Sequence, residues 1–370
     1  MQIAPSPNLP TSLEEAAYKA FQWSKNYFGV AHKFASTQAS SAIVKLWQLS
    51  DQVLGQQQPR QLPGGVPISA TTMAVVQARY ERLLDADWQD AVAGYYPKSL
   101  LFDNPWADFV QYYPLVWADL ISISDRVTHK RFQDFAADVD TEGYPDYYIQ
   151  NFHHQTNGYL SDLSASLYDL QVELLFGGSA DAMRRRIVRP LVDYAARWGK
   201  SQRILDVACG TGRTLRLLRQ SLPDVQLVGT DLSPAYLRKA NQLLSELPGE
   251  LPQLIQAPGE ALPFTDNYFD ALTTVFLFHE LPRAVRQPVI AEMVRVTKPG
   301  GVIVICDSIQ IEDSPELQES MEAFAQIFHE PYYRDYIRDD LGAYLTAAGC
   351  EILEVTSHFM SRYTVARKSS

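Results

Sequence analysis

The sequence has few of the features that mark disulfide-rich, zinc-binding or membrane-spanning proteins. Its 370 residues include three cysteines, Cys209, Cys306 and Cys350, and no Cys-x-x-Cys pair. This count excludes a disulfide framework and a cysteine zinc site, and it fits a reducing compartment. There is no run of about 18 apolar residues, so no transmembrane span is predicted. The N-terminus lacks the basic and apolar regions of a signal peptide, and we therefore expect a cytoplasmic protein.

Positive charge is also in short supply. The chain has 32 Lys and Arg against 43 Asp and Glu, a formal net charge of −11. A basic surface for nucleic acid is therefore not expected. With 46% hydrophobic and 20% charged residues the composition is that of a folded globular protein. The sequence leaves the oligomeric state open, and the segment 1–70 could dock on the main body, on a partner or on a membrane surface.

The first half of the chain predicts helices. A capping box formed by Ser12 and Glu15 opens an amphipathic run to Phe28, and a second apolar run covers 34–49. The segment 56–70 is rich in Gln, Pro and Gly and is expected to be a linker. The predicted organisation is a helical segment 1–55, the linker 56–70, a helical, aromatic-rich substrate and lid domain 71–178, and an α/β domain 179–370.

Aromatic residues are concentrated between Tyr95 and Tyr168, well above their 11% share of the whole chain. Large rings bury much area per residue, so they could close a small helical core. Alternatively, they could form a wall for an apolar substrate. In the helix that follows, the run Arg184-Arg185-Arg186 is most simply a solvated face.

The second half of the chain alternates short β-branched runs with helical stretches. This pattern predicts a parallel sheet with crossover helices. The runs cover 203–207, 225–230, 253–256, 269–276 and 301–309. Two last runs, 350–356 and 360–366, are too close together for an intervening helix, so they are expected to form an antiparallel hairpin.

A glycine-rich turn after the first of these strands carries the strongest functional signal. Gly210 and Gly212 would let the backbone approach a ligand, and the next helix would present its positive N-terminus. Asp231 ends the next strand and could accept both hydroxyls of a ribose, or it could cap a helix together with Ser233. A dinucleotide-binding turn needs a third small residue where Leu215 stands. A ligand with one nucleoside and an amino-acid end is therefore favoured over a nicotinamide dinucleotide.

Four segments in order carry a family resemblance: 206–212 (DVACGTG), 229–233 (GTDLS), 259–270 (GEALPFTDNYFD) and 295–301 (RVTKPGG). With them, residues 180–368 resemble the class I S-adenosylmethionine (SAM)-dependent methyltransferases. The resemblance is closest to the ubiquinone/menaquinone C-methyltransferase-like branch, methyltransferase type 11. It implies a Rossmann-like seven-stranded sheet, mostly parallel, with its last strand antiparallel in a C-terminal hairpin, after an N-terminal helical domain.

The resemblance also implies a set of SAM-binding residues. The glycine loop would cradle the methionine part, Asp231 would take the ribose diol, 259–261 would close over the adenine, and Phe276 would stack near the ligand. The full set is Asp206, Ala208, Gly210, Thr211, Gly212, Asp231, Leu232, Gly259, Glu260, Ala261 and Phe276. In two places the sequence departs from many relatives. Ala208 stands where they have Gly, and Pro258 stands where they have Asp, so that Glu260 or a backbone carbonyl would have to receive the adenine amino group.

Candidate catalytic residues are less well defined. His279 follows the fourth strand and could take a proton from the acceptor, or it could simply hold a backbone carbonyl. Tyr159 is the second candidate, and with His153 and His154 it could belong to a lid; alternatively the two histidines bond locally at the surface. Adjacent histidines without nearby Cys or carboxylate spacing predict no metal site.

The expected activity is methyl transfer from SAM to a small, apolar or aromatic acceptor. Alignment of the reactants and exclusion of water can supply much of the rate of such a reaction. Two alternatives remain at this point. Ala208 and Pro258 are compatible with a catalytically degenerate SAM-binding or scaffold protein, and the glycine turn is compatible with an NAD(P)-linked oxidoreductase.

Overall fold

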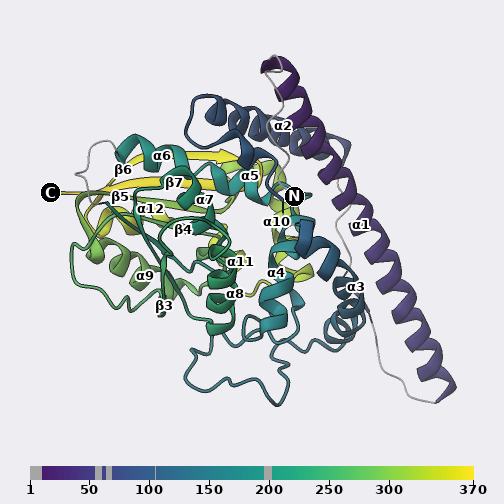
Figure 1. Cartoon of the computed structure of the whole chain (residues 1–370). Helices are drawn as coiled ribbons and strands as arrows, with labels where there is room; N and C mark the ends of the chain where they lie inside the picture. Colours follow the sequence, from purple (N-terminus) through teal and green to yellow (C-terminus); the bar gives the residue numbers. More distant parts are fainter. Residues whose placement is uncertain (1–10, 55–60, 64–68, 105, 196–201) are drawn as a thin grey trace.

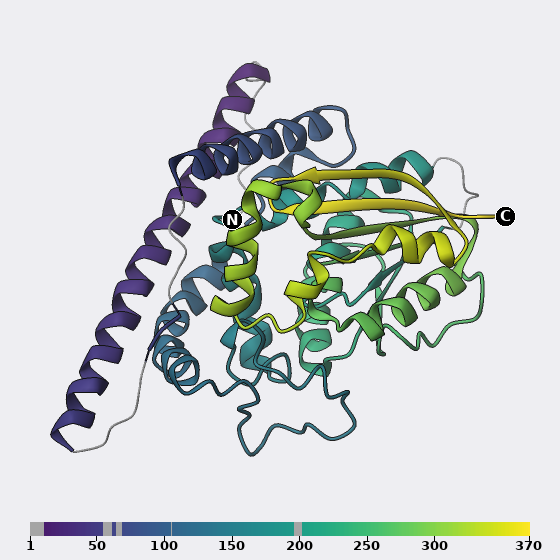
Figure 2. The ribbon, with the colours of Figure 1, turned by 180° about the vertical axis from the view of Figure 1, so that it is seen from behind.

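The computed structural model describes residues 11–54, 61–63, 69–104, 106–195 and 202–370, so most of the predicted linker lies outside the described residues. A seven-stranded sheet with helices on both faces makes up the C-terminal half (Figure 1). The helices of the N-terminal half stand beside it, and the longest of them is on the side away from the sheet in both views (Figures 1 and 2).

The predicted sheet is confirmed, including its antiparallel end. Its spatial order is β3-β2-β1-β4-β5-β7-β6. The first five strands are parallel, β7 is antiparallel to β5, and β6 pairs antiparallel with β7. The strands are β1 (Arg203–Val207), β2 (Gln226–Asp231), β3 (Gln253–Gln256), β4 (Phe269–Val275), β5 (Thr297–Ser308), β6 (Cys350–His358) and β7 (Ser361–Lys368).

The helices form two groups. Those beside the sheet are α1 (Thr11–Val53), α2 (Ala70–Val92), α3 (Trp106–His129) and α4 (Asp162–Leu175), while α5 (Ala180–Arg185) and α6 (Val188–Ala195) already pack on the sheet. Those of the sheet domain are α7 (Arg213–Ser221), α8 (Pro234–Leu244), α9 (Arg283–Val296), α10 (Gln318–Ile327), α11 (Tyr333–Tyr336) and α12 (Leu341–Ala347). The 3₁₀ helices are η1 (Lys98–Leu101), η2 (Phe152–His154), η3 (Phe278–Glu280), η4 (Ile311–Asp313) and η5 (Pro315–Leu317).

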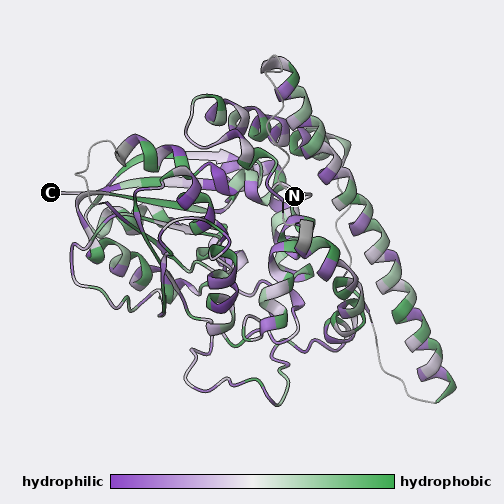
Figure 3. Ribbon diagram, viewed as in Figure 1, coloured by the Kyte–Doolittle hydropathy of each residue, from purple (hydrophilic) through white to green (hydrophobic). Residues whose placement is uncertain are grey.

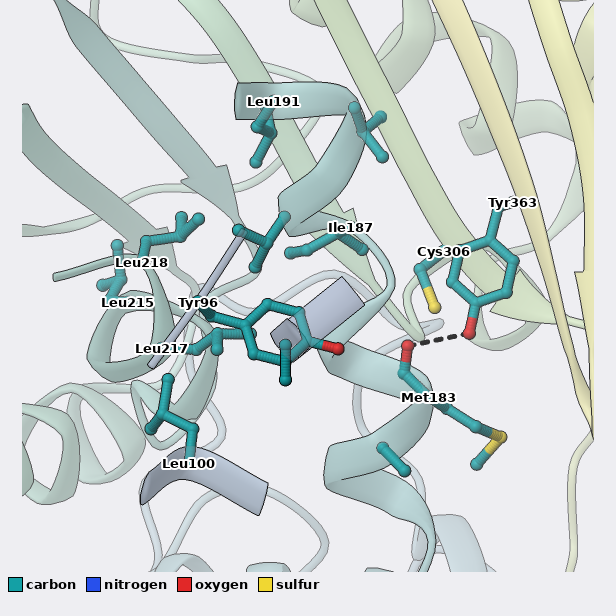
Figure 4. Close-up of a cluster of buried hydrophobic side chains, with 14 of the residues drawn as sticks. Tyr96, Leu100, Met183, Ile187, Leu191, Leu215, Leu217, Leu218, Cys306 and Tyr363 are labelled. Atoms are coloured by element: carbon teal, nitrogen blue, oxygen red, sulfur yellow. Dashed lines mark hydrogen bonds between the residues drawn. The ribbon is translucent and has the colours of Figure 1, made fainter. Parts of the chain in front are cut away.

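Alternate residues of the buried strands belong to two different hydrophobic cores, one on each face of the sheet. Ile204 of β1 belongs to the core under α5, α6, α7 and α8, whereas its neighbour Leu205 belongs to the core under α9 and α12. Successive side chains of a strand point to opposite faces, so two apolar neighbours cover both faces. Figure 4 shows the first core, where Tyr363 of β7 donates a 2.7 Å hydrogen bond to the carbonyl of Met183.

The long N-terminal segment Thr11–Val53 forms one continuous helix, α1, rather than two separate runs. The expected capping box at Ser12 is wrong, because the helix already includes Thr11 and places Ser12 inside its first turn. The helix continues through Gly29, where a Cβ atom would come within 2.9 Å of the Gly177 backbone. Hydrophobic and polar residues are intermixed along α1 (Figure 3), and none of the described helices is long and apolar enough to span a membrane.

The interpretation of Arg184-Arg185-Arg186 as a solvated face is wrong. Arg184 and Arg185 are buried, and Arg185 donates from Nε and Nη2 to the Asp87 carboxylate at 2.9 and 2.6 Å. Asp87 is fully buried and also accepts from the hydroxyls of Tyr18 and Tyr96. A buried guanidinium is tolerated only when it is paired, and the sequence run does not show where its partners lie. Asp87 thus connects α1, α2 and α5.

Replacing Asp87 by Asn should destabilise the protein strongly. The variant keeps the size of the side chain but leaves the Arg185 charge buried without its partner, which costs about 3–5 kcal/mol. The free energy of unfolding in urea measures the effect. Asp85→Asn is the control, because its carboxylate is exposed and pairs with Lys19 at the surface, and an exposed pair contributes about 0–1 kcal/mol. Equal stability of the two variants would contradict the role given to Asp87.

Candidate active site

The predicted glycine turn joins β1 to α7. Ala208, Gly210 and Gly212 have φ angles of +57°, +53° and +83°, so the chain enters the left-handed region three times within the turn. A Cβ on Gly210 would meet no atom within 4 Å, whereas one on Gly212 would come within 2.9 Å of the Ala240 side chain. Gly210 therefore opens onto free space, and Gly212 lets α8 approach the turn.

Asp231 faces this turn. Its carboxylate accepts 2.8 Å hydrogen bonds from the backbone N–H groups of Gly210 and Ser233. It is not the cap of α8, because Ser233 is the N-cap residue and its hydroxyl accepts from the Tyr236 N–H. Burial raises the pKa of Asp231 to about 6, although the bonds from Ser233 and Gly210 act to lower it.

Asp206, the last acidic residue before the turn, is buried without a partner. It is 1% exposed, and neither carboxylate oxygen has a hydrogen-bond partner among the described residues. Burial raises its pKa well above the usual value. Since an unpaired buried carboxylate is costly, this position suits a positively charged or hydrogen-bond-donating ligand group.

A cavity of about 730 Å³, its open mouth included, lies beside the turn. Eight of the predicted residues line it: Tyr159, Ala208, Gly210, Asp231, Leu232, Gly259, Glu260 and Phe276. Asp206, Thr211, Gly212 and Ala261 do not line it. The Thr211 hydroxyl instead donates to Asp169 of α4 at 2.7 Å, and Ala261 is exposed.

Pro258, which cannot accept a hydrogen bond through its side chain, lies in the same cavity wall as Glu260. Tyr147 donates its hydroxyl to Oε1 of Glu260 at 2.7 Å. The second oxygen, Oε2, is buried and has no partner among the described residues. Glu260 can therefore accept a further hydrogen bond that Pro258 cannot.

A second and larger cavity, of about 1950 Å³ with its open mouth included, lies between the helical half and the sheet domain. Its walls come from α1, α2 and α4 on one side and from η3, α10 and the β6–β7 turn on the other. Most of its lining is apolar, including Val172, Met321 and Phe324. The two cavities share three wall residues, Tyr168, Phe276 and Glu280.

Some tyrosines of the aromatic-rich segment belong to the core, and others line a cavity. Tyr96 is a core residue, whereas Tyr147, Tyr148, Tyr159 and Tyr168 line the smaller cavity. Of these only Tyr168 also reaches the larger one. The segment thus supplies an aromatic wall to the smaller cavity, whereas the larger cavity is lined mainly by other elements.

His279 lies in the wall of the larger cavity and is held by an acid. Its Nδ1 is 2.6 Å from Oδ1 of Asp307, a residue that is 1% exposed at the end of β5. Asp307 also accepts from the N–H groups of Phe278 and Ser308, so its carboxylate is fixed. Burial alone would lower the pKa of His279, but Asp307 and the more distant carboxylates raise it to about 9.

Tyr159 and His153 meet at Glu280. The Tyr159 hydroxyl donates to Oε1 of Glu280 at 2.5 Å, and Nε2 of His153 lies 3.8 Å from the same oxygen and 2.8 Å from Oε1 of Glu330. Burial opposes a charge on His153, but Glu330 and Glu280 raise its pKa to about 10. Tyr159 is buried and its pKa is raised well above the usual value, so it keeps its proton.

His154 takes a different position from His153. Its side chain is buried, its Nε2 lies 3.0 Å from the Ile327 carbonyl, and it lines neither cavity. The alternative that both histidines bond locally at the surface is wrong, because η2 packs against α3 and against the end of α10. Of the two, only His153 reaches the larger cavity.

Four polar residues of this site were not found from the sequence: Asp169, Asp307, Glu280 and Glu330. Asp307 could have been found, since it lies at the end of the strand beside β4 and the carboxyl ends of parallel strands share one edge. Glu280 is adjacent to His279. Asp169 and Glu330 are single acidic residues in helical surroundings, and no local pattern distinguishes them.

Comparison with known proteins gives consistent results. Residues 204–301 match a family model described as a methyltransferase domain. The chain is 31% identical to the demethylmenaquinone methyltransferase of Thermus thermophilus over 183 residues, which is 49% of this chain and 77% of the relative. It is 36% identical to the ubiquinone/menaquinone biosynthesis C-methyltransferase of Geobacter sulfurreducens over 146 residues, 39% of this chain and 54% of the relative.

The chain thus spans between about half and three quarters of the length of these two curated relatives. A solved SAM-dependent methyltransferase from Aquifex aeolicus aligns with a TM-score of 0.39 and 20% identity, covering 54% of this chain and 97% of that one. The sequence match to the Thermus enzyme covers more than two thirds of that protein. The chain belongs to the class I SAM-dependent methyltransferases, in the branch of the ubiquinone/menaquinone C-methyltransferases.

Proposed function

We propose that the smaller cavity binds SAM. Two features of the cavity wall fit such a ligand: Gly210 leaves room for it, and Asp231 can accept the ribose hydroxyls. The free Oε2 of Glu260 would accept a hydrogen bond from the adenine amino group. The dinucleotide alternative loses its support, because Leu215 is packed in the core and the family is a methyltransferase family.

The acceptor would occupy the larger cavity. The observation that carries this proposal is the shared wall of Tyr168, Phe276 and Glu280, where the two cavities meet. These three residues border both cavities, so ligands in the two cavities would come closest to each other beside them. Phe276 stacks on Phe176 with ring centroids 5.7 Å apart, which fixes one side of the opening.

The size and lining of the larger cavity indicate the class of acceptor. A large space with a mainly apolar lining favours an apolar molecule, and the polar side chains of His279 and Glu280 in the same wall favour a hydroxylated ring beside them. The names of the two curated relatives refer to quinone biosynthesis. We therefore propose a hydroxylated aromatic ring that carries an apolar tail, as in a demethylated quinol.

The protein's part in the reaction is to orient, to exclude water and to move one proton. When bound, SAM supplies an electrophilic methyl group. The helices α1, α2 and α4 form one side of the cavity and would shield the acceptor from water there. Asp307 orients His279, and the neutral form of its ring, whose share grows as the pH rises toward its pKa of about 9, can take the proton of the acceptor hydroxyl through the second ring nitrogen, so that the acceptor ring gains electron density for attack. Tyr159 keeps its proton and holds Glu280 in place.

A methyl-transfer assay tests the proposal. The chain is incubated with labelled SAM and with reduced benzo- and naphthoquinols that do or do not carry an isoprenoid tail. We expect labelled product, and more of it from the tailed quinols. Binding of SAM and S-adenosylhomocysteine by calorimetry is measured alongside. Binding without transfer to any member of the panel would favour the scaffold alternative, and absence of SAM binding would contradict the site itself.

His279→Asn should lower kcat by about 100-fold or more, the range expected for a lost general base. SAM affinity should stay unchanged, because His279 does not line the smaller cavity. Asp307→Asn should have a smaller effect in the same direction, since it only misorients the ring. His32→Asn on α1 serves as the control. A kcat unaffected by His279→Asn would remove the residue from the mechanism.

A further inference from the structure

We propose that His153, Glu280 and Glu330 bind a divalent transition-metal ion at the wall of the larger cavity. One donor atom from each residue lies within 4.8 Å of the other two. Donors around one ion, at about 2.0–2.2 Å each, stand about 3–3.4 Å apart. Small side-chain rotations would therefore close the three onto a shared centre.

The Glu330 carboxylate is the feature that points to a ligand. It is 1% exposed, and its Oε2 makes no hydrogen bond with any described residue. Its Oε1 is nevertheless directed at the cluster, 2.8 Å from Nε2 of His153. Buried polar atoms nearly always have partners, so the unpartnered Oε2 beside the His153–Glu330 pair leaves a place for a cation.

The charge of the cluster leads to the same conclusion. Two carboxylates and one histidine carry a net charge of −1 even with the histidine protonated, and no Lys or Arg in the described part of the chain pairs with Glu280 or Glu330. With a neutral His153, a divalent ion brings the total to zero. Burying an uncompensated negative charge is costly, and the ion removes that cost.

The donor set indicates the class of metal. One imidazole and two carboxylates suit Mn²⁺, Fe²⁺ or Zn²⁺ better than Mg²⁺ or Ca²⁺, which prefer oxygen donors alone. Three protein donors leave coordination positions free, and His153 and Glu280 both line the larger cavity. If the proposed function holds, the free positions would take a hydroxyl oxygen of the acceptor and favour its ionised form.

Metal binding can be measured without any acceptor. The tag-free full chain is freed of metal with chelator and titrated with Mn²⁺ by calorimetry, with Co²⁺ absorption as a second probe. We expect one ion per chain, and at least about tenfold weaker binding in His153→Gln and in Glu330→Gln. Glu319→Gln, an exposed glutamate on α10, is the matched control and should bind like the parent protein.

The SAM affinity of each variant keeps this test separate from the proposed function. His153 and Glu330 do not line the smaller cavity, so both variants should bind SAM normally, which also shows that they are folded. Normal SAM binding without stoichiometric Mn²⁺ or Co²⁺ binding to the parent chain overturns the metal site. Metal binding that survives both substitutions overturns it as well, because the ion then lies elsewhere.

Discussion

Replacing Asp231 by Ala should weaken SAM binding by at least about 100-fold, because two hydrogen bonds to a charged acceptor contribute about 1.5–3 kcal/mol each. The variant also frees the N–H groups of Gly210 and Ser233, which Asp231 holds in the present structure. Both losses act on the same turn, so the effect should be among the largest of any single substitution. Calorimetric titration with SAM and with S-adenosylhomocysteine measures it.

Asp224→Ala is the matched control for this experiment. Asp224 is exposed in the turn before β2, outside the wall of either cavity. Its removal should leave SAM affinity unchanged. The melting temperature of both variants shows whether they are folded. A folded Asp231→Ala protein that binds SAM like the parent chain would show that the ribose is held elsewhere.

Met321→Trp should block the larger cavity. Met321 is a buried residue of α10 whose side chain lines that cavity. A ring of this size would occupy space that the proposed apolar tail needs, so kcat/KM for a tailed quinol should fall by about 100-fold. A short quinol without a tail should be affected much less. SAM affinity should stay at the parent value, because Met321 is not part of the smaller cavity.

Met321→Leu is the control, since a swap that conserves volume is tolerated by most cores. Its kcat/KM for both acceptors should stay near that of the parent protein. Comparison of the two substitutions separates loss of space from loss of the methionine itself. Equal losses for tailed and short acceptors in Met321→Trp would contradict the assignment of this cavity to the tail.

Much of the sheet domain could be predicted from local sequence. The run 203–207 became β1 with the predicted bounds, because two-sided burial needs a continuous apolar stretch. The short spacing before Met360 left no room for a crossover helix, and the hairpin of β6 and β7 followed. The glycine turn and Asp231 were predicted to bind parts of one ligand, and a 2.8 Å hydrogen bond joins them.

The parts that were missed depend on contacts between distant segments. From its sequence neighbours, Arg185 is predicted to be a solvated charge on a helix. Its partner Asp87 lies far away in the sequence, and only the fold brings the two together. His153, Glu280 and Glu330 are far apart in the sequence, and several strands of the sheet lie between them. No spacing rule therefore brings the three together. The larger cavity is likewise built from α1, α2, α4 and α10, and a volume between elements leaves no pattern in any one of them.

A crystal structure of the full chain with S-adenosylhomocysteine is the most direct test of the central claim, that one cavity holds the methyl donor and opens into the other. The account predicts the ribose on Asp231 and the sulfur at the junction of Tyr168, Phe276 and Glu280, directed toward the larger cavity. A nucleoside bound away from Asp231, or a sulfur facing a closed wall, would contradict it.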